Sequence, residues 1–241
     1  MLRLRRCLRT FPEPIHSCKN HQLFSARFTK SRKLGMPLEK FEIQPLFATP
    51  YAKADLGYGI TPDQIKYVQN LKMVKNQANL ISENLYIFEE PELKVMAEAV
   101  QEALNRYSRE VMGISQKIVI TQSWGLMNPP NVGMHAHAHS NSIVSGSLYY
   151  CELPDPVSRV FFDRHTMYRQ IELNPEDSRR NLYNSPVNMI TPKVNELFMF
   201  PSDINHMIEA NGSSEPRRAI AFNSFVKGRF GNYRDVSELK I

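Results

Sequence analysis

The sequence predicts a mainly β protein, a sandwich or jelly roll with flanking helices, from two observations. The second half of the chain consists of short segments rich in β-branched and aromatic residues, which are separated by clusters of turn-forming residues. The first half contains two segments with the residue spacing of amphipathic helices. Because helical spacing is almost absent between the strands, we expect packed sheets with the helices on one outer face.

Two helices are predicted before the strands. Thr61-Pro62-Asp63-Gln64 combines a Thr N-cap, a Pro at the first helical position and a Gln that completes a capping box. The second helix is predicted from Pro91 to Met112, and Gly113 ends it. Its apolar face consists of Leu93, Met96, Val100, Leu104, Tyr107 and Val111. The predicted strands that follow are KIVITQSWGL, SIVSGSLYYCEL, RVFFD, ELFMF and RAIAFNSFV.

Composition narrows the class of protein. The chain has 241 residues, of which 42% are hydrophobic, so it can bury a sizeable core. No stretch approaches about 18 consecutive apolar residues, and no membrane association is expected. The three cysteines, Cys7, Cys18 and Cys151, are too few and too scattered for a disulfide framework or a four-ligand zinc site. A cytoplasmic location is therefore the default expectation.

Residues 1–35 differ from the rest of the chain in charge. They contain nine basic residues and one acidic residue, whereas the remaining 206 residues contain 21 basic and 23 acidic ones. An Arg-rich, acid-poor start is typical of a mitochondrial transit peptide, and it is equally typical of a disordered extension. We therefore expect one folded domain at residues 36–241. Since this domain is close to neutral, nucleic acid is not an expected partner.

Three histidines in one run are the strongest chemical signal. Side chains alternate along a strand, so His135, His137 and His139 are predicted to share one face. A His-x-His pair can bind a first-row transition metal, provided that another ligand comes from elsewhere. His206, which follows a predicted strand and the turn Pro201-Ser202-Asp203, is the best candidate for it. Imidazole suits iron, zinc, copper and nickel alike, and a plain polar strand face is the alternative interpretation.

Arg217 begins a predicted strand 11 residues after His206. Alternation places it on one face with Ala219 and Ala221, where small side chains leave room for a carboxylate ligand to bind the guanidinium through two hydrogen bonds. The alternative is a surface arginine in an ion pair.

These residues resemble a known family. The motifs are HAHSNSIVSGSLYY from His137 to Tyr150, then Phe200-Pro201-Ser202 with His206, and then Arg217 with Phe222-Asn223. Together with Trp124 and the segment from Ile43 to Pro50, they are similar to the 2-oxoglutarate- and Fe(II)-dependent oxygenases of many marine bacteria and their phages. The resemblance covers about residues 42–227. If the gene is carried by a phage, the expected location is the host cytoplasm.

The resemblance implies a double-stranded β-helix, which is the cupin-like form of the jelly roll, with Fe(II) at one end of the barrel. His137 corresponds to the first metal ligand and His206 to the distal one. His139 stands where the wider superfamily has a carboxylate. We expect His139 to be the middle ligand, followed in order of preference by Asp163 and Asn141.

The resemblance also implies that Arg217 binds the distal carboxylate of 2-oxoglutarate, with Tyr150 or Ser145 adding a hydrogen bond. The implied reaction couples decarboxylation of 2-oxoglutarate to succinate with hydroxylation of a substrate C–H bond. Trp124, Met127 and Met134 are candidates for the substrate mouth, although a role in the core is favoured for each. The expected partners are O2 and a small-molecule or protein side-chain substrate, and a homodimer stays open.

Two other functions compete with this one. A three-histidine cupin-type metalloenzyme would keep the fold and the metal without using 2-oxoglutarate. A non-enzymatic jelly-roll module would use the same fold for structure or binding.

Overall fold

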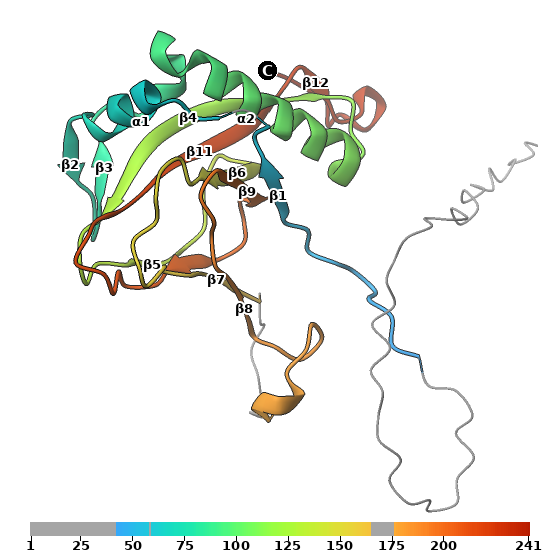
Figure 1. The fold of residues 1–241 in the computed structure, drawn as a ribbon. Coiled ribbons are helices and arrows are strands. Elements are labelled where there is room, and N and C mark those ends of the chain that lie inside the picture. Colours follow the sequence, from blue (N-terminus) through green and yellow to red (C-terminus); the bar gives the residue numbers. More distant parts are fainter. Residues whose placement is uncertain (1–41, 58, 165–175) are drawn as a thin grey trace, which may run out of the picture. The chain divides into compact units, whose positions relative to one another are not determined.

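The computed structural model describes residues 42–57, 59–164 and 176–241. The chain divides after Gln44, and the unit Pro45–Ile241 contains all the helices and strands that the structure describes. Its fold is mainly β, as the sequence predicts (Figure 1). The predicted extension, residues 1–35, lies outside the described residues.

The described elements follow one another along the chain as helices and short strands. The strands are β1 (Ala52–Asp55), β2 (Met73–Lys75), β3 (Leu80–Ser82), β4 (Lys117–Asn128), β5 (Met134–His137), β6 (Val144–Leu148), β7 (Val160–Asp163), β8 (Val187–Ile190), β9 (Glu196–Pro201), β10 (His206–Ile208), β11 (Arg217–Lys227), β12 (Arg229–Phe230) and β13 (Leu239–Lys240). The α-helices are α1 (Pro62–Gln69) and α2 (Lys94–Arg106). The other helical turns are η1 (Ile87–Glu89), η2 (Pro91–Leu93), the π-helix η3 (Tyr107–Met112), η4 (Asp177–Arg179) and η5 (Tyr233–Asp235).

Two antiparallel sheets form the body of this unit. The larger has seven strands in the order β1-β9-β6-β11-β4-β3-β2, and the smaller has four in the order β5-β10-β7-β8. Figure 1 shows α1 and α2 on one side of the larger sheet, with β5, β7 and β8 on the other. The helices therefore cover one outer face of a jelly roll, as predicted.

Both predicted helices are present. Thr61 caps α1, and the complete capping box with Gln64 forms. The second predicted helix is one helical run built from η2, α2 and η3, and Gly113 ends it in the left-handed region. Val111 was expected on the buried face but is 41% exposed, because the wider π-helical turn rotates this residue away from the core.

Alternation along the strands separates two packed layers. Ile220 and Phe222 of β11 pack with α2 residues such as Met96 and Val100 in the larger apolar cluster. Ala219 of the same strand packs with Tyr149 and Phe198 on the opposite face, in a smaller cluster between the two sheets. The face toward the smaller sheet is the one that carries the functional side chains.

All five predicted strands form, with changes in their length. β4 extends to Asn128, whereas SIVSGSLYYCEL gives only the five residues of β6. The histidine run is only partly a strand, since β5 ends at His137 and His139 lies beyond it. The three-residue strands β2, β3 and β10 were missed because so short a segment shows no clear alternation.

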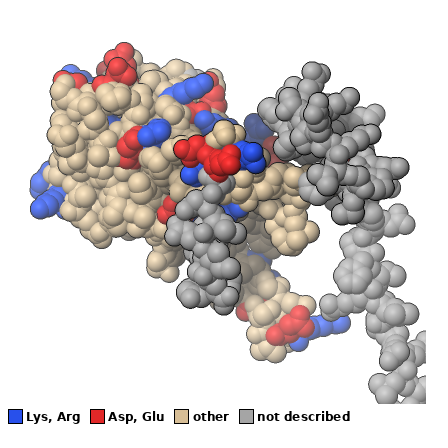
Figure 2. Space-filling view, turned by 90° about the horizontal axis from the view of Figure 1, so that it is seen from below, with Lys and Arg blue, Asp and Glu red and all other residues tan. Residues whose placement is uncertain are grey.

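Acidic and basic side chains are interspersed on the face shown in Figure 2. This mixture agrees with the small net charge of residues 36–241. No helix among the described residues is long and apolar enough to span a membrane.

Gly146 lies where the larger sheet is tightly packed, and a substitution there can test this packing. A Cβ atom at this position would lie 2.4 Å from the Phe198 carbonyl oxygen and 2.5 Å from the Phe222 ring. We expect Gly146→Ala to lower the free energy of unfolding by about 1–3 kcal/mol, measured by urea denaturation. Gly59→Ala is the control, because a Cβ there meets nothing within 4 Å. Equal stability of the two variants would contradict the tight packing around Gly146.

Candidate metal centre

Three histidines from two paired strands and the turn after one of them meet at one point. β5 and β10 pair so that His137 lies opposite His206. His139 is held beside them because its backbone N–H donates to the Ser202 carbonyl oxygen at 2.9 Å. One ring nitrogen from each of the three histidines lies within 4.8 Å of the other two. Metal–imidazole bonds of about 2.0–2.1 Å put ligating nitrogens about 3–4 Å apart, so this group is close to the spacing that a shared ion needs.

Hydrogen bonds orient two of the imidazoles. The Nδ1 of His206 donates to the Ile204 carbonyl oxygen at 3.0 Å, and the Nδ1 of His137 donates to the His135 carbonyl oxygen at 2.8 Å. Each bond leaves Nε2 with a free lone pair. The Nε2 atoms of His139 and His206 are 3.3 Å apart. The three rings thus present nitrogen atoms that could bind a metal toward a common centre.

Two of the imidazoles are neutral at ordinary pH. Burial, with smaller effects from His206 and His137, lowers the pKa of His139 to about 3. Burial, followed by the nearby His137, lowers the pKa of His206 to about 4, against the opposing effect of its bond to Ile204. A neutral imidazole is the form that binds a metal, so these histidines need no deprotonation to act as ligands.

The other candidates for the metal lie outside this group. His135 is exposed, and its ring centroid lies 5.4 Å from that of His137. Asp163, on β7, accepts a hydrogen bond from the side chain of Asn205 at 3.2 Å. Asn141 occupies a turn with a positive φ of 54°. Among the described residues, the metal-competent group consists of His137, His139 and His206.

Arg217 lies between the two sheets and is 1% exposed. Its Nη2 donates to the Tyr149 hydroxyl at 2.9 Å, and its guanidinium lies 5.1 Å from the centre of the Tyr149 ring. Its Nε and Nη1 are buried and have no hydrogen-bond partner among the described residues. A buried guanidinium with two unused donors is a binding group for an anion, because such donors are costly to leave unpaired.

The tyrosine beside Arg217 is Tyr149 and not Tyr150, which corrects the sequence interpretation. Side chains alternate after β6, and Tyr150 packs in the cluster under the helices. Ser145 does face the space between the sheets, but its hydroxyl already donates to the Asn223 side chain at 2.9 Å. Alternation places Tyr149 on the same face as Ser145, and this signal was available in the sequence.

A cavity of about 290 Å³ adjoins the histidines. Trp124 and Met134 line it, as considered from the sequence. Met127 does not, because it lies on the other face of β4, where its sulfur contacts Arg218 at 3.0 Å. Residues that the sequence did not single out also line this cavity, among them Asn76, Asn79, Gln122, Asn128 and Ser147.

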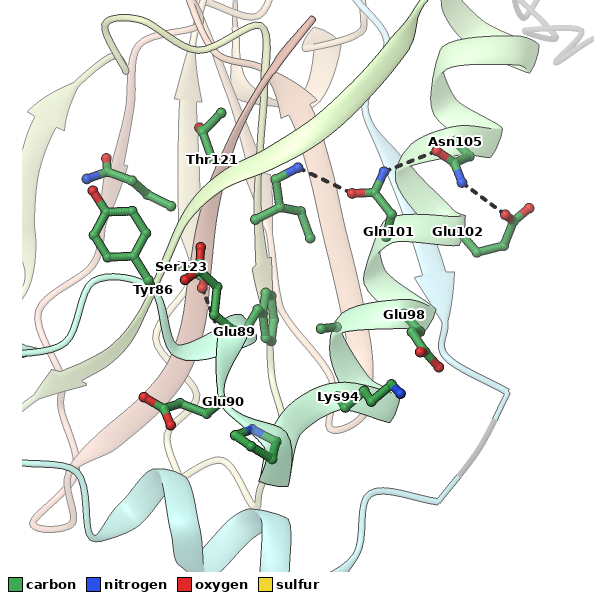
Figure 3. A pocket seen from close by; sticks show the side chains of 15 residues that line it. Tyr86, Glu89, Glu90, Lys94, Glu98, Gln101, Glu102, Asn105, Thr121 and Ser123 are labelled. Carbon is green, nitrogen blue, oxygen red and sulfur yellow. Dashed lines mark hydrogen bonds between the residues drawn. The ribbon is translucent and has the colours of Figure 1, made fainter. Parts of the chain in front are cut away.

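A second, larger groove of about 600 Å³ runs between α2 and β4 (Figure 3). Its four carboxylates are those of Glu89, Glu90, Glu98 and Glu102. Gln101 lies at its wall, where the amide donates to the Ile118 carbonyl oxygen at 2.8 Å and accepts from the Ile120 N–H at 3.3 Å. Gln101 thus pairs with the edge of β4 as a neighbouring strand would.

Three serine hydroxyls join the two segments that carry His139 and His206. Ser202 donates to Ser142 at 2.8 Å, and its hydroxyl lies 2.8 Å from that of Ser145. Ser145 and Ser202 are each 1% exposed. Because Ser202 follows β9 in the FPS motif and also holds His139, this serine network sets the positions of both histidines. Sequence reasoning missed it, since serines in turns rarely signal a buried network.

Comparison with known proteins finds one matching family model and solved structures with a similar fold. Residues 122–223, which include the three histidines and Arg217, match the family model described as "Putative 2OG-Fe(II) oxygenase". No curated protein matches the sequence. The fold is similar to that of HygX from Streptomyces hygroscopicus with nickel and 2-oxoglutarate bound, at 10% identity over 73% of this chain and 82% of HygX, with a TM-score of 0.52. It is also similar to the non-heme alpha ketoglutarate dependent carbocyclase SnoK from nogalamycin biosynthesis, at 12% identity over 75% of this chain and 81% of SnoK, with a TM-score of 0.53.

Fold and site together define a double-stranded β-helix protein with a group of three histidines that could hold a metal ion. Residues 122–223 match the model of the 2OG-Fe(II) oxygenase family, and the solved structures with bound or required 2-oxoglutarate share the fold.

The depressed pKa values of His139 and His206 predict how stability depends on pH. In the unfolded chain an imidazole takes up a proton below about pH 6.5. In the folded protein these two stay neutral until about pH 3 and 4. The unfolded state therefore binds more protons in between, and we expect the metal-free protein to lose stability steadily as the pH falls from about 6.5 toward 4.

Urea denaturation at several pH values measures this effect. The His139→Ala variant should show a shallower loss over the same range, because it lacks one of the two groups. An identical slope in the variant and the wild type would contradict the buried, neutral state of His139.

The serine network predicts a loss of metal affinity. Ser202→Ala removes the hydroxyl that joins the two segments, and we expect Co(II) affinity to fall about 10–100-fold, followed by the Co(II) absorption spectrum. Ser158→Ala is a matched control, because Ser158 is 3% exposed and its hydroxyl has no partner among the described residues. Equal Co(II) affinities in the two variants would show that the serine network does not position the histidines.

Proposed function

We propose that the protein is an Fe(II)- and 2-oxoglutarate-dependent oxygenase. His137, His139 and His206 hold the Fe(II), and Arg217 binds the distal carboxylate of 2-oxoglutarate. The observation that carries the proposal is the state of Arg217, a fully buried guanidinium on the sheet face that bears the cavity. Its Nε and Nη1 have no hydrogen-bond partner among the described residues. The relative HygX has nickel and 2-oxoglutarate bound on a similar fold, which supports the same pair of ligands here.

The charges of the site favour a dicarboxylate. The three proposed ligands are imidazoles, so the protein supplies no negative charge directly to the metal. Arg217 adds a further positive charge, and its partners among the described residues are the hydroxyl and ring of Tyr149. 2-Oxoglutarate offers one carboxylate to each positive centre. The cosubstrate therefore supplies charge that the protein itself lacks.

The bound metal, together with 2-oxoglutarate and O2, would supply the oxidation, in which O2, 2-oxoglutarate and a substrate C–H give CO2, succinate and a C–OH group. The chain's own residues bind, orient and exclude water. Tyr149 fixes the direction of Arg217, and the serine network fixes His139 and His206. Phe200, whose ring centroid lies 4.7 Å from that of His206, shields that histidine from solvent on one side.

The two competing functions have less support. A cupin-type enzyme without 2-oxoglutarate would leave the buried donors of Arg217 unexplained. A purely structural module would need neither these donors nor three converging imidazoles.

Anaerobic titration of the full chain with Fe(II) and then 2-oxoglutarate tests the proposal. We expect the weak visible band of an Fe(II)–2-oxoglutarate chelate. Arg217→Met should weaken 2-oxoglutarate binding at least about 10-fold, because charge-assisted hydrogen bonds are lost. Arg218→Met is the control, since its guanidinium lies on the opposite face against Met127.

Two outcomes would contradict the assignment. Iron binding without the visible band would remove 2-oxoglutarate from the site and favour the cupin-type enzyme. Equal 2-oxoglutarate affinities of the Arg217 and Arg218 variants would remove Arg217 from the cosubstrate site.

A further inference from the structure

Arg217 lies on the sheet face that bears the cavity beside the histidines, but it is not among the described residues that line this cavity. Arg217 leans toward β6, because its guanidinium bonds to Tyr149. β3 and β4 lie on the other side of β11. If Arg217 binds 2-oxoglutarate as proposed above, the cosubstrate lies over β6 and β11, and the wall over β3 and β4 is left for the substrate. The inference that follows rests on that proposed function.

Asn79 is the first polar group of this wall. It ends the turn between β2 and β3, it is 2% exposed and it lines the cavity. Its Oδ1 accepts from the side chain of Asn76 at 3.2 Å. Its Nδ2 has no hydrogen-bond partner among the described residues. This donor is not among the fully buried unpaired side-chain atoms of the described residues, so it is accessible and can donate to a ligand in the cavity.

Asn128 supplies the complementary group. It is 1% exposed, lines the same cavity, and donates through Nδ2 to the Val132 carbonyl oxygen at 3.4 Å. Its Oδ1 has no partner among the described residues and is free to accept. Leu80 of β3 pairs with Met127 of β4, so the next residues, Asn79 and Asn128, continue this register side by side. The wall therefore offers a donor and an acceptor on neighbouring strands.

The cavity contains no charged side chain among the described residues that line it. Its remaining polar groups are carboxamides, imidazoles and a serine hydroxyl, and Ile81, Leu85 and Trp124 add apolar surface. A charged group that entered this wall would lose its hydration without gaining an ion pair. The four carboxylates of the larger groove do not change this, because Gln122 is the one residue that the groove and the cavity share.

We propose that Asn79 and Asn128 bind an uncharged carboxamide group of the substrate. The amide carbonyl accepts from Asn79 Nδ2, and the amide N–H donates to Asn128 Oδ1. An amide fits better than an alcohol or an ion, because its donor and acceptor are separate atoms that match the two separate asparagines. The substrate class is thus a molecule that presents a neutral amide beside the metal centre.

Fluorescence of Trp124 provides a direct test. Trp124 is the chain's only tryptophan, and it lines the cavity. The full chain is saturated with Zn(II) and 2-oxoglutarate, so that the histidines and Arg217 are filled, and then titrated with four probes of similar size: propionamide, propionate, propylammonium and 1-propanol. We expect propionamide to bind at least about 10-fold more tightly than each of the other three.

Asn79→Asp makes the test specific. The new carboxylate should weaken propionamide at least about 10-fold and strengthen propylammonium, since the wall gains a negative charge and loses a donor. Gln77→Asp is the matched control, because it adds the same charge to the same turn at an exposed position that does not line the cavity. Asn79→Leu, which removes the donor without adding charge, should also weaken propionamide.

The outcomes separate this inference from the proposed function. If wild-type protein forms the Fe(II)–2-oxoglutarate band but shows no preference for propionamide, the amide site is overturned and the oxygenase assignment stands. Equal effects of Asn79→Asp and Gln77→Asp would overturn it as well. If the band itself is absent, the cosubstrate assignment fails first.

Discussion

The pairing of β5 with β10 is the constraint on which the site depends. It places His137 directly opposite His206, although 68 residues separate them in the chain. A shift of this register by one residue would turn one imidazole to the other face of the sheet and break the pair. The bond from His139 to Ser202 then ties the third imidazole to the segment that leads into β10. One short antiparallel pairing thus assembles three groups from distant parts of the sequence.

The larger sheet contributes through alternation. On β11, Ile220 and Phe222 anchor the strand under the helices, which fixes Arg217, Ala219 and Ala221 on the side toward the smaller sheet. Small side chains at 219 and 221 leave space there that larger ones would fill. The same alternation sends Tyr149 toward Arg217 and Tyr150 toward the core. The packing that stabilises the fold also orients Arg217, the proposed ligand of 2-oxoglutarate.

Elements with a strong local sequence pattern could be predicted from the sequence. Features that depend on long-range contacts could not. The capping box at Thr61, the five predicted strands and the histidine run all carry signals within a few residues. The π-helical turn that exposes Val111 and the strands of three residues carry none, because tertiary packing decides them. Asn79 and Asn128 were missed because asparagines beside a turn ordinarily mark only the turn. Their role follows from β3 lying beside β4, which brings together residues about fifty positions apart.

Charge explains why the wall over β3 and β4 suits a neutral group. In the proposed complex, a doubly positive metal ion on neutral imidazoles, together with Arg217, would exceed the two negative charges of 2-oxoglutarate by one. A cationic substrate group next to this centre would be repelled, since the lining side chains of the described residues offer no carboxylate. An anionic group would be attracted, but it would compete with the cosubstrate for the metal and for Arg217. A neutral group avoids both problems, and carboxamides can hold it through hydrogen bonds without adding charge. The absence of charge from the wall over β3 and β4 would therefore allow the substrate and 2-oxoglutarate to be distinguished beside the proposed metal centre.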